Sequence, residues 1–293
     1  MADSILRGII GGNAMRFFVA CTRDAVNEAN EIHKTTPVAA AALGRLLTAS
    51  AMMGCMMKND SDLLTLMIRG DGPIGGIVAT SDSNCRIKGY AYQPDAVLPL
   101  KPNGKLDVSG AIGAGTLSVI KDTGLKEPYF SQIELISGEI AEDLTHYFAT
   151  SEQTPSSVAL GVLVDRNRTI KQAGGFILQS LPTASAEAID EAEKNILSMP
   201  PITSLLSSGS SQEDIIRLIA GKLNYEITDS LPVSYWCNCS RNRVEKALAS
   251  LGAKGVTDIM REDGQAEMHC HFCGKNYHFS INDLESLLCD IKQ

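Results

Sequence analysis

Four of the eight cysteines in this 293-residue chain stand in two close pairs near its C-terminal end. The first pair has the spacing C-x-C at residues 237–239, and the second has the spacing C-x-x-C at residues 270–273. Two such pairs can present four thiolates to one point, and four thiolates complete the tetrahedral shell of a Zn²⁺ ion. The spacing therefore predicts one closed zinc site per chain, with the ligands Cys237, Cys239, Cys270 and Cys273.

Other interpretations of these cysteines stay open. They could be ordinary half-buried cysteines or the structural disulfides of an exported protein. We expect no secretory signal in the first residues, which lack a basic segment followed by an apolar one. The remaining cysteines are scattered singly, unlike a disulfide framework, at positions 21, 55, 85 and 289. A zinc site is therefore the favoured prediction for the two pairs.

The C-x-C pair also bears on what the zinc does. Pairs in structural zinc ribbons are usually separated by two or more residues, so this spacing is tight. A disulfide within it would close a small strained ring, and strained, exposed disulfides are the easily reduced, regulatory kind. The spacing favours a redox switch. His269, His271 and His278 could each replace a cysteine, but four thiolates already fill the shell, so we expect supporting or surface roles for them.

Further motifs accompany the cysteines along the chain. In order they are residues 69–76 (RGDGPIGG), 137–143 (SGEIAED), 151–156 (SEQTPS), 174–176 (GGF) with Gln179 and Pro182, 237–241 (CNCSR) and 270–273 (CHFC). Together they resemble the bacterial heat-shock protein thirty-three family of redox-regulated holdase chaperones, over essentially the whole chain. His271 departs from the family pattern, which favours an acidic residue there, so the family's oxidation rates are not expected to carry over.

We predict an α+β fold in three parts. Residues 1–179 are expected to form an N-terminal core and dimerisation domain, with a mixed α/β sheet around a buried helix. Residues 180–232 are expected to form an acidic, metastable helical linker, and residues 233–293 a small C-terminal zinc-binding redox-switch domain with a Cys₄ site. The hydrophobic content of 44% is enough to bury a core of this size.

The first part alternates strand and helix patterns. Strands are predicted at 15–22, 63–69, 75–81, 85–92, 115–120, 130–136, 157–164 and 169–178, and helices at 24–33, 37–57 and 139–149. The helix at 37–57 opens on a hydroxyl cap and a proline, and it is apolar nearly all round. Arg45 in its middle makes a buried helix a better prediction than a membrane span. Its methionines are expected in the core or a dimer interface, a promiscuous binding surface being the alternative.

The predicted linker is acidic, because residues 180–232 hold three Lys or Arg against eight Asp or Glu, a net charge of −5. Helices are predicted at 184–197 and 212–223, separated by a Pro-Pro pair at 200–201 and a Ser-Gly stretch at 207–211. Their apolar stripes need a partner surface; the stripe residues are Ile189, Ile196, Leu197, Ile215, Ile216, Leu218 and Ile219. We expect marginal docking on the first domain, with a permanent helical layer of that domain as the alternative.

The last part contains its own local signals. We expect Ser240 to cap a helix that ends at Gly252, strands at 265–271 and 276–279, and a final helix opened by a capping box at 280–283. Gly274 is expected to take the left-handed turn that metal knuckles need. Cys289 follows a leucine stripe and is predicted to lie in the core; the stripe is Leu284, Leu287 and Leu288.

Two other functional classes are disfavoured. The net charge is −8, and a Cys₄ zinc site would add about −2 to a module that is already acidic, whereas nucleic-acid readers are basic. For an enzyme we find no pairing of a nucleophile with a base and no open metal position, and only His33 and His146 lie outside the cysteine region. We therefore predict no nucleic-acid partner, no membrane partner and no enzymatic activity.

The family resemblance implies a cytoplasmic holdase that binds unfolded client proteins and prevents their aggregation during oxidative stress. It implies a zinc-bound, inactive reduced form, which disulfide formation activates through zinc release and local unfolding, and an active homodimer. We expect the disulfides Cys237–Cys239 and Cys270–Cys273, because near neighbours have the highest effective concentration once zinc leaves.

Overall fold

The computed structural model describes residues 2–291. The chain forms two compact units, Met1–Trp236 and Cys237–Gln293, which are described separately below. The first unit combines two sheets with helices, and the second combines a hairpin with helices. The predicted α+β fold class is confirmed.

Sheet A of the first unit is antiparallel and has the strand order β10-β1-β2-β9-β8. Its strands are β1 (Ser4–Ile10), β2 (Met15–Cys21), β8 (Ser156–Val164), β9 (Ile170–Ser180) and β10 (Tyr225–Pro232). Successive residues of β2 enter two different apolar clusters, Phe18 in one and Phe17 and Val19 in the other. Because successive side chains of a strand point to opposite faces, both faces of sheet A are apolar and covered.

Sheet B has the strand order β11-β5-β4-β3-β6-β7, and it is antiparallel except for the parallel pair of β11 with β5. Its strands are β3 (Leu63–Gly70), β4 (Gly76–Asp82), β5 (Arg86–Ala91), β6 (Gly115–Asp122), β7 (Tyr129–Glu134) and β11 (Ser234–Tyr235). Three helices accompany the sheets, namely α1 (Arg23–His33), α3 (Val108–Ile112) and α4 (Ala141–Thr150).

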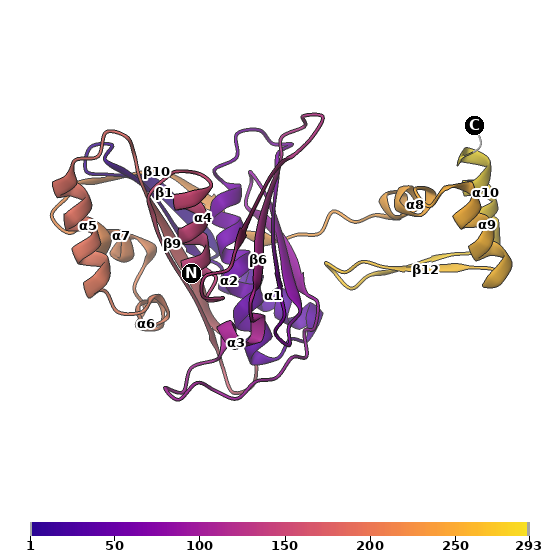
Figure 1. Cartoon of the computed structure of the whole chain (residues 1–293), viewed down its shortest axis with the longest axis horizontal. Coiled ribbons are helices and arrows are strands. Elements are labelled where there is room, and N and C mark those ends of the chain that lie inside the picture. The colour runs from indigo at the N-terminus through magenta and orange to yellow at the C-terminus, as the bar shows by residue number, and fades with distance from the viewer. Residues whose placement is uncertain (1, 292–293) are drawn as a thin grey trace. The chain divides into compact units, whose positions relative to one another are not determined.

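Helix α2 (Pro37–Gly54) forms the centre of the first unit and packs against strands of both sheets (Figure 1). The hydroxyl of Thr36 accepts a hydrogen bond from the N–H of Ala39 at 3.5 Å, which confirms the predicted cap. By length and composition α2 could cross a membrane, but 89% of its 18-residue window is buried inside the protein. The prediction of a buried core helix is therefore confirmed. The helix ends three residues earlier than predicted, at Gly54.

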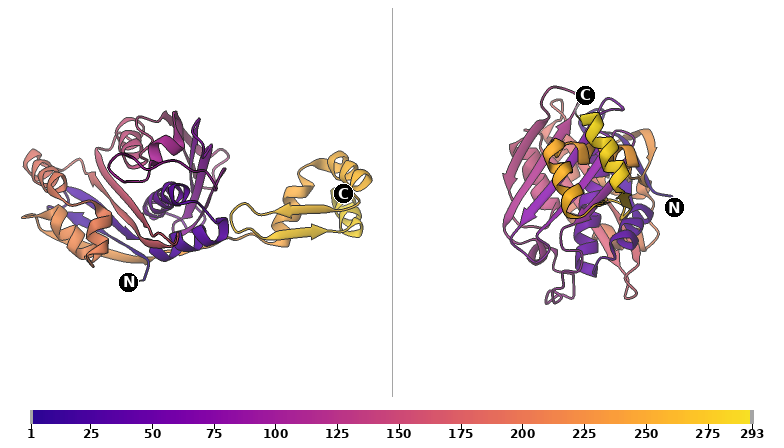
Figure 2. Two further views of the ribbon diagram at one scale, coloured as in Figure 1. Left: turned by 90° about the horizontal axis from the view of Figure 1, so that it is seen from below. Right: turned by 90° about the vertical axis from the view of Figure 1, so that its right-hand side faces the viewer.

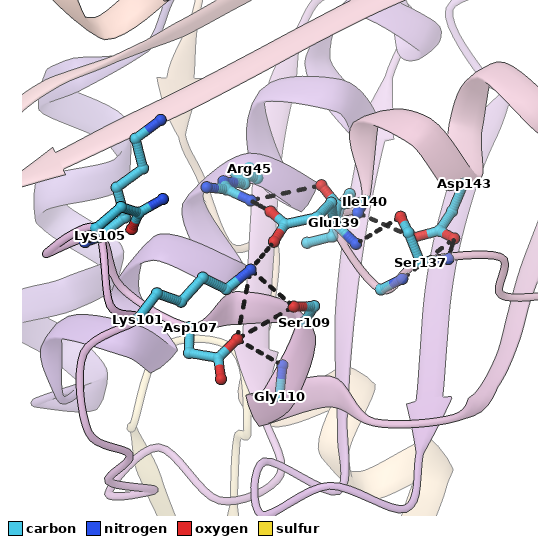
Figure 3. Close-up of polar contacts among 12 residues, drawn as sticks. Arg45, Lys101, Lys105, Asp107, Ser109, Gly110, Ser137, Glu139, Ile140 and Asp143 are labelled. Carbon is cyan, nitrogen blue, oxygen red and sulfur yellow. Dashed lines mark hydrogen bonds and ion pairs between the residues drawn. The ribbon is translucent and has the colours of Figure 1, made fainter.

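Arg45, in the middle of α2, is held by a network of charged side chains (Figure 3). Its Nη1 lies 2.6 Å from Oε2 of Glu139, and Nζ of Lys101 lies 2.6 Å from Oε1 of the same carboxylate. Lys101 also contacts Asp107 and Ser109, which begin α3. Burial opposes ionisation of Glu139, but the hydrogen bonds from Lys101 and Arg45 outweigh it and lower its pKa. These partners explain how an apolar helix accommodates an arginine.

A layer of three helices covers the face of sheet A opposite α2 (Figure 2). The helices are α5 (Ala186–Ser198), α6 (Ile202–Ser207) and α7 (Gln212–Ala220). Helix α6 packs on β8 and β9, α7 packs on β1, β2 and β10, and α5 packs on α7. We call these three helices the α5–α7 layer.

The structure contains several strands and helices that the sequence did not predict. Residues 225–232 were expected to be part of a helical segment, but they form strand β10 because the edge of β1 offers its backbone groups for pairing. Strand β1 and the short helices α3 and α6 are also unpredicted. Of the predicted apolar stripe, Leu197 is 87% exposed and Leu218 is 43% exposed, whereas Ile215, Ile216 and Ile219 are fully buried.

The second unit consists of the hairpin β12 (Ala266–His269) and β13 (Asn276–Phe279) with the helices α8 (Arg241–Ala249), α9 (Gly252–Glu262) and α10 (Ile281–Ile291). Both predicted caps are present: Ser240 caps α8, and Ser280 forms a capping box with Asp283. The prediction that Cys289 is core is wrong, because it lies on the exposed side of α10. Among the described residues of this second unit, 237–291, only four side chains are fully buried: Leu248, Val256, Phe279 and Leu284.

Candidate metal centre

The structure brings the four predicted cysteines together. Cys237 and Cys239 lie on the segment that leads into α8, and Cys270 and Cys273 lie in the turn between β12 and β13. All four sulfur atoms lie within 4.8 Å of one another, and each side chain is half-buried. Two of these contacts join Cys237 with Cys270 at 3.7 Å and Cys239 with Cys273 at 3.2 Å.

The hairpin turn fixes the second pair through its backbone. The N–H of Cys270 donates to the carbonyl of Lys275 at 2.9 Å, and the N–H of Gly274 donates to the carbonyl of Cys270 at 2.9 Å. Gly274 has a φ of 70°, which confirms the predicted left-handed turn. On the first pair, Ser240 turns the chain into α8 immediately after Cys239, because its hydroxyl accepts from the N–H of Arg243 at 3.3 Å.

The donor set fits a tetrahedral zinc ion. Zinc–sulfur bonds of roughly 2.3 Å place the sulfurs of a tetrahedral site about 3.8 Å apart. Two of the sulfur–sulfur distances, 3.2 and 3.7 Å, and the upper limit of 4.8 Å lie around that value. Four thiolates also match the preference of zinc for soft ligands. Within residues 2–291, these cysteines are the one group of His, Cys, Asp and Glu side chains arranged closely enough to hold a metal ion.

The close approach of the sulfurs perturbs their ionisation. Burial and the neighbouring thiols raise the pKa of Cys237 and Cys273. Burial opposes ionisation of Cys239 as well, but hydrogen bonds from Tyr277 and the neighbouring thiols outweigh it and lower its pKa to about 7. Of these three thiols Cys239 thus ionises most readily, whereas Cys237 and Cys273 resist a second negative charge beside it. A bound dication would relieve that repulsion.

Tyr277 is a member of the site that the sequence did not reveal. Its hydroxyl donates a hydrogen bond to Sγ of Cys239 at 3.1 Å, from the adjacent strand β13. No spacing rule connects the two residues, since the contact depends on how β13 pairs with β12. None of the three nearby histidines belongs to the cluster: Nδ1 of His269 lies 2.6 Å from Oδ1 of Asn276, and the His278 side chain is 74% exposed.

A short anchored segment of the first unit precedes Cys237. Strand β11 pairs with β5, and the hydroxyl of Tyr235 donates to the carbonyl of Gly89 at 3.0 Å. The guanidinium of Arg86 lies 4.4 Å from the ring centroid of Trp236, the single tryptophan of the chain. We call residues 233–236 the tether.

Comparison with known proteins finds relatives along the whole chain. The sequence profile of the family described as Hsp33 protein matches residues 3–280. The 33 kDa chaperonins of Lachnoclostridium phytofermentans and Clostridioides difficile are 49% and 50% identical to the chain, and each alignment covers 98% of it and 99% of the relative. The crystal structure of the 33 kDa chaperonin (heat shock protein 33 homolog) from Thermotoga maritima matches with a TM-score of 0.91 and 38% identity, covering 99% of both chains.

Proposed function

The chain belongs to the Hsp33 family of chaperones, and on that premise we propose that it is a redox-regulated holdase. In this role it binds unfolded proteins and prevents their aggregation during oxidative stress. The observation that carries the proposal is the cluster of four cysteine sulfurs within 4.8 Å of one another. A site built only from thiols is a site that an oxidant can dismantle.

Zinc bound by Cys237, Cys239, Cys270 and Cys273 would hold the second unit folded. Among residues 237–291, the core of that unit contains only four fully buried side chains. A core of this size supplies at most about 3–5 kcal/mol, whereas binding of a structural zinc ion contributes roughly 10–16 kcal/mol to folding. The folded state of the second unit therefore depends on its thiolates, with one Zn²⁺ per chain in the reduced, inactive form.

Oxidation removes these ligands. Formation of Cys237–Cys239 and Cys270–Cys273 disulfides transfers four electrons from the thiolates to two molecules of peroxide, whose O–O bonds break and which take up four protons from the solvent to give four water molecules. No thiolate is then left to bind zinc. Two close sulfur contacts of the folded site run across the pairs instead, from Cys237 to Cys270 and from Cys239 to Cys273. Cross-pair contacts are lost as the unit unfolds, whereas sequence neighbours stay close, so we retain the neighbour pairing. Peptide mapping that found mainly cross-pair bonds would contradict it.

The α5–α7 layer is the element that we propose converts this unfolding into client binding. In α5, the buried residues are only Ala188 and Ala192. Residues 180–232 carry a net charge of −5, which opposes close packing of this segment. We propose that docking of the layer is marginal, although Ile202, Leu205 and Leu206 of α6 and the three isoleucines of α7 are buried against sheet A. Its release would expose the apolar face of sheet A together with the apolar sides of the helices.

Further assignments follow from the family. We propose that residues 1–179 form the core and dimerisation domain, residues 180–232 the metastable linker and residues 233–293 the redox-switch domain. The active form is proposed to be a homodimer in the cytoplasm, without nucleic-acid, membrane or enzymatic function. Sedimentation of the oxidised protein as a monomer at the concentration where it protects clients would contradict the dimer.

A light-scattering experiment tests the holdase proposal. A chemically denatured client is diluted into buffer with reduced zinc-loaded protein, with peroxide-treated protein, or with neither. Suppression of aggregation by the oxidised form alone, unaffected by competing RNA, is the expected result. Equal suppression by both forms would refute redox control. Loss of suppression in the presence of RNA would instead favour a nucleic-acid binder.

A further inference from the structure

A cavity of about 340 Å³ lies between sheet A and the end of α2, within the first unit. Strands β1, β2 and β10 and the turn after α2 contribute to its lining. Among the lining residues, all of which belong to the described part of the chain, three are cationic and none is acidic. The cations are Arg7, Arg16 and Lys58. In a chain whose net charge is −8, a cavity lined only by positive charge points to an anionic ligand.

The strand register brings the two arginines together. In the β1–β2 pair, Arg7 lies opposite Phe18, and Arg16 lies two positions before Phe18 on the same face. The guanidinium of Arg16 lies 5.9 Å from the centroid of the Phe18 ring. The two arginines are therefore diagonal neighbours on the face of sheet A that meets α2, where their charges repel each other. A bound anion would remove this repulsion.

A β-bulge positions Arg7 at the mouth of this face. Strand β10 contains one extra residue, Thr228, opposite the step from Arg7 to Gly8. The Thr228 hydroxyl donates to the carbonyl of Arg7 at 3.1 Å. A Cβ on Gly8 would lie 1.9 Å from the carbonyl oxygen of Glu226, so the close approach of β10 requires glycine there. Bulges of this kind redirect side chains and are common beside active sites.

Both arginines keep hydrogen-bond donors for a ligand. Arg7 donates from Nη1 to the carbonyl of Cys55 at 3.1 Å and from Nη2 to Oδ2 of Asp229 at 2.8 Å. Nε of Arg16 donates to Oε1 of the neutral Gln179 at 2.8 Å. A guanidinium has five N–H donors, so these bonds leave donors on each arginine.

The turn after α2 supplies the third cation and an apolar wall. Oδ2 of Asp62 accepts from the N–H groups of Lys58 and Asn59 at 3.2 and 3.0 Å, which fixes the turn. The Lys58 side chain is exposed and has no hydrogen bond or ion pair within residues 2–291. Met56 and Met57 are half-buried and line the same cavity. Because methionine adapts to irregular apolar shapes, a ligand with both an anionic group and an apolar part fits this lining.

We propose that the cavity binds a small organic phosphate. Arg7, Arg16 and Lys58 hold the phosphate group, and the apolar part of the ligand contacts Met56 and Met57. A phosphate monoester carries close to two negative charges at pH 7 and presents several oxygens to the guanidinium forks, whereas a carboxylate carries one charge. The volume lies near the lower end of the range for ligand pockets, about 300–1,000 Å³, so the ligand is a small molecule.

Binding has a structural consequence for the first unit. The cavity joins β10, the last strand before the tether, to β1, β2 and the turn after α2. A ligand that contacts all four segments binds the folded unit and not the unfolded chain. It therefore raises the stability of the first unit in proportion to the logarithm of its concentration once that concentration exceeds the Kd.

Titration calorimetry of the full-length, reduced, zinc-loaded protein tests the proposal, with phenyl phosphate as the probe. We expect saturable binding of one phenyl phosphate per chain with a Kd below about 1 mM, and a midpoint of thermal unfolding that rises with its concentration. Inorganic phosphate lacks the apolar part, and benzoate lacks the second charge. Each should bind at least about 10-fold more weakly than phenyl phosphate.

Two variants and a control locate the site. Lys58→Gln removes a cation whose side chain has no partner in the folded protein, so the fold should be unaffected. It should weaken phenyl phosphate binding about 10-fold, and Arg16→Gln should weaken it by at least as much, since each removes a hydrogen bond to a charged group. Lys126→Gln, on the exposed loop between β6 and β7, is the matched control and should leave the Kd unchanged.

Three results would overturn the proposal. One is the absence of saturable binding of phenyl phosphate to the parent protein up to about 10 mM. Another is an unchanged Kd in either Lys58→Gln or Arg16→Gln, which would place the bound phosphate elsewhere. The third is equal affinity for inorganic phosphate and phenyl phosphate, which would show that the apolar wall takes no part in binding.

Discussion

Replacing both Ile215 and Ile219 of α7 by aspartate should release the α5–α7 layer while zinc stays bound and the thiols stay reduced. Both isoleucines are fully buried in the apolar cluster that joins α7 to sheet A. Each substitution forfeits about 2–3 kcal/mol of apolar burial. Each aspartic acid must also stay protonated in that apolar site at pH 7, about three pH units above its ordinary pKa. This raises the free-energy cost of docking by about another 4 kcal/mol at each site.

The two sites together therefore oppose docking by about 12–14 kcal/mol, a figure comparable to the whole stability of a typical domain, about 5–15 kcal/mol. The interactions that favour docking are the contacts of three short helices with the first unit. They include the Gln212 side chain, whose Nε2 donates to the carbonyls of Ser4 and Val19 at 2.8 and 2.7 Å. The layer should not stay docked against such a penalty.

Hydrogen exchange and client aggregation provide the assay. In the double variant, residues 186–220 should lose protection while β2 and β9 keep theirs, and the reduced protein should suppress aggregation. Leu218→Asp is the matched control, because it adds a charge to the same helix at a side chain that is already 43% exposed. It should leave both measurements unchanged.

Two results would refute the reasoning. If residues 186–220 stay as protected as β2 and β9, the helices are a permanent layer of the first unit. If the layer is released without client binding, the client surface lies elsewhere. Should β2 and β9 lose protection too, the milder Ile219→Ala, with an expected loss of about 2–5 kcal/mol, replaces the double variant.

The metal centre and the Arg45 network provide three further predictions. Cys270→Ser leaves three thiolates and an open, weaker site, so chelator titration should remove its zinc at concentrations that the parent survives. Tyr277→Phe removes the hydrogen bond to Cys239 and should weaken zinc binding about 10–100-fold in the same titration, while Tyr129→Phe should not. Glu139→Gln should destabilise the first unit by about 1–3 kcal/mol at pH 7 in urea unfolding. Because the folded pKa of Glu139 is lowered from its ordinary 4.5, its stabilisation is complete above that value and lost as the pH falls through the folded pKa, so variant and parent should converge in acid.

A specific result would contradict each of these three predictions. Full zinc occupancy of Cys270→Ser at the chelator concentration that the parent just survives would remove that residue from the ligand set. Equal zinc affinity of Tyr277→Phe and the parent would show that the hydrogen bond does not support the site. A stability difference for Glu139→Gln that is the same at neutral and acid pH would exclude ionisation as its cause, with Glu127→Gln on an exposed loop as the control.

The sequence predicted that the four cysteines come together, because the arrangement within each pair is local. Each cysteine pair lies within one turn of chain, and Gly274 supplies the backbone conformation that the second turn needs. The burial of α2 could also be predicted from the sequence, since its apolar residues surround the helix on all sides. Features of this kind depend on neighbours in the chain, which a sequence displays directly.

Contacts between residues that lie far apart in the sequence could not be predicted in this way. Glu139 pairs with Arg45 from 94 residues away, and Tyr277 reaches Cys239 from 38 residues away. Strand β10 forms because β1 offers an edge, and its own sequence, with Glu226 and Asp229, is a weak strand former. Cys289 continues a leucine stripe by one position, and one position turns a helix by about 100°, enough to move it from the core to the surface.

The coupling of zinc release to chaperone activity is the central claim, and one time course tests it directly. Zinc released to a colorimetric chelator and suppression of client aggregation are measured in the same peroxide-treated sample of the zinc-loaded, full-length protein. Release of one zinc ion per chain should rise together with client protection, and both should reverse on reduction with added zinc. Full client protection while zinc remains bound, or complete zinc release without any protection, would contradict the account.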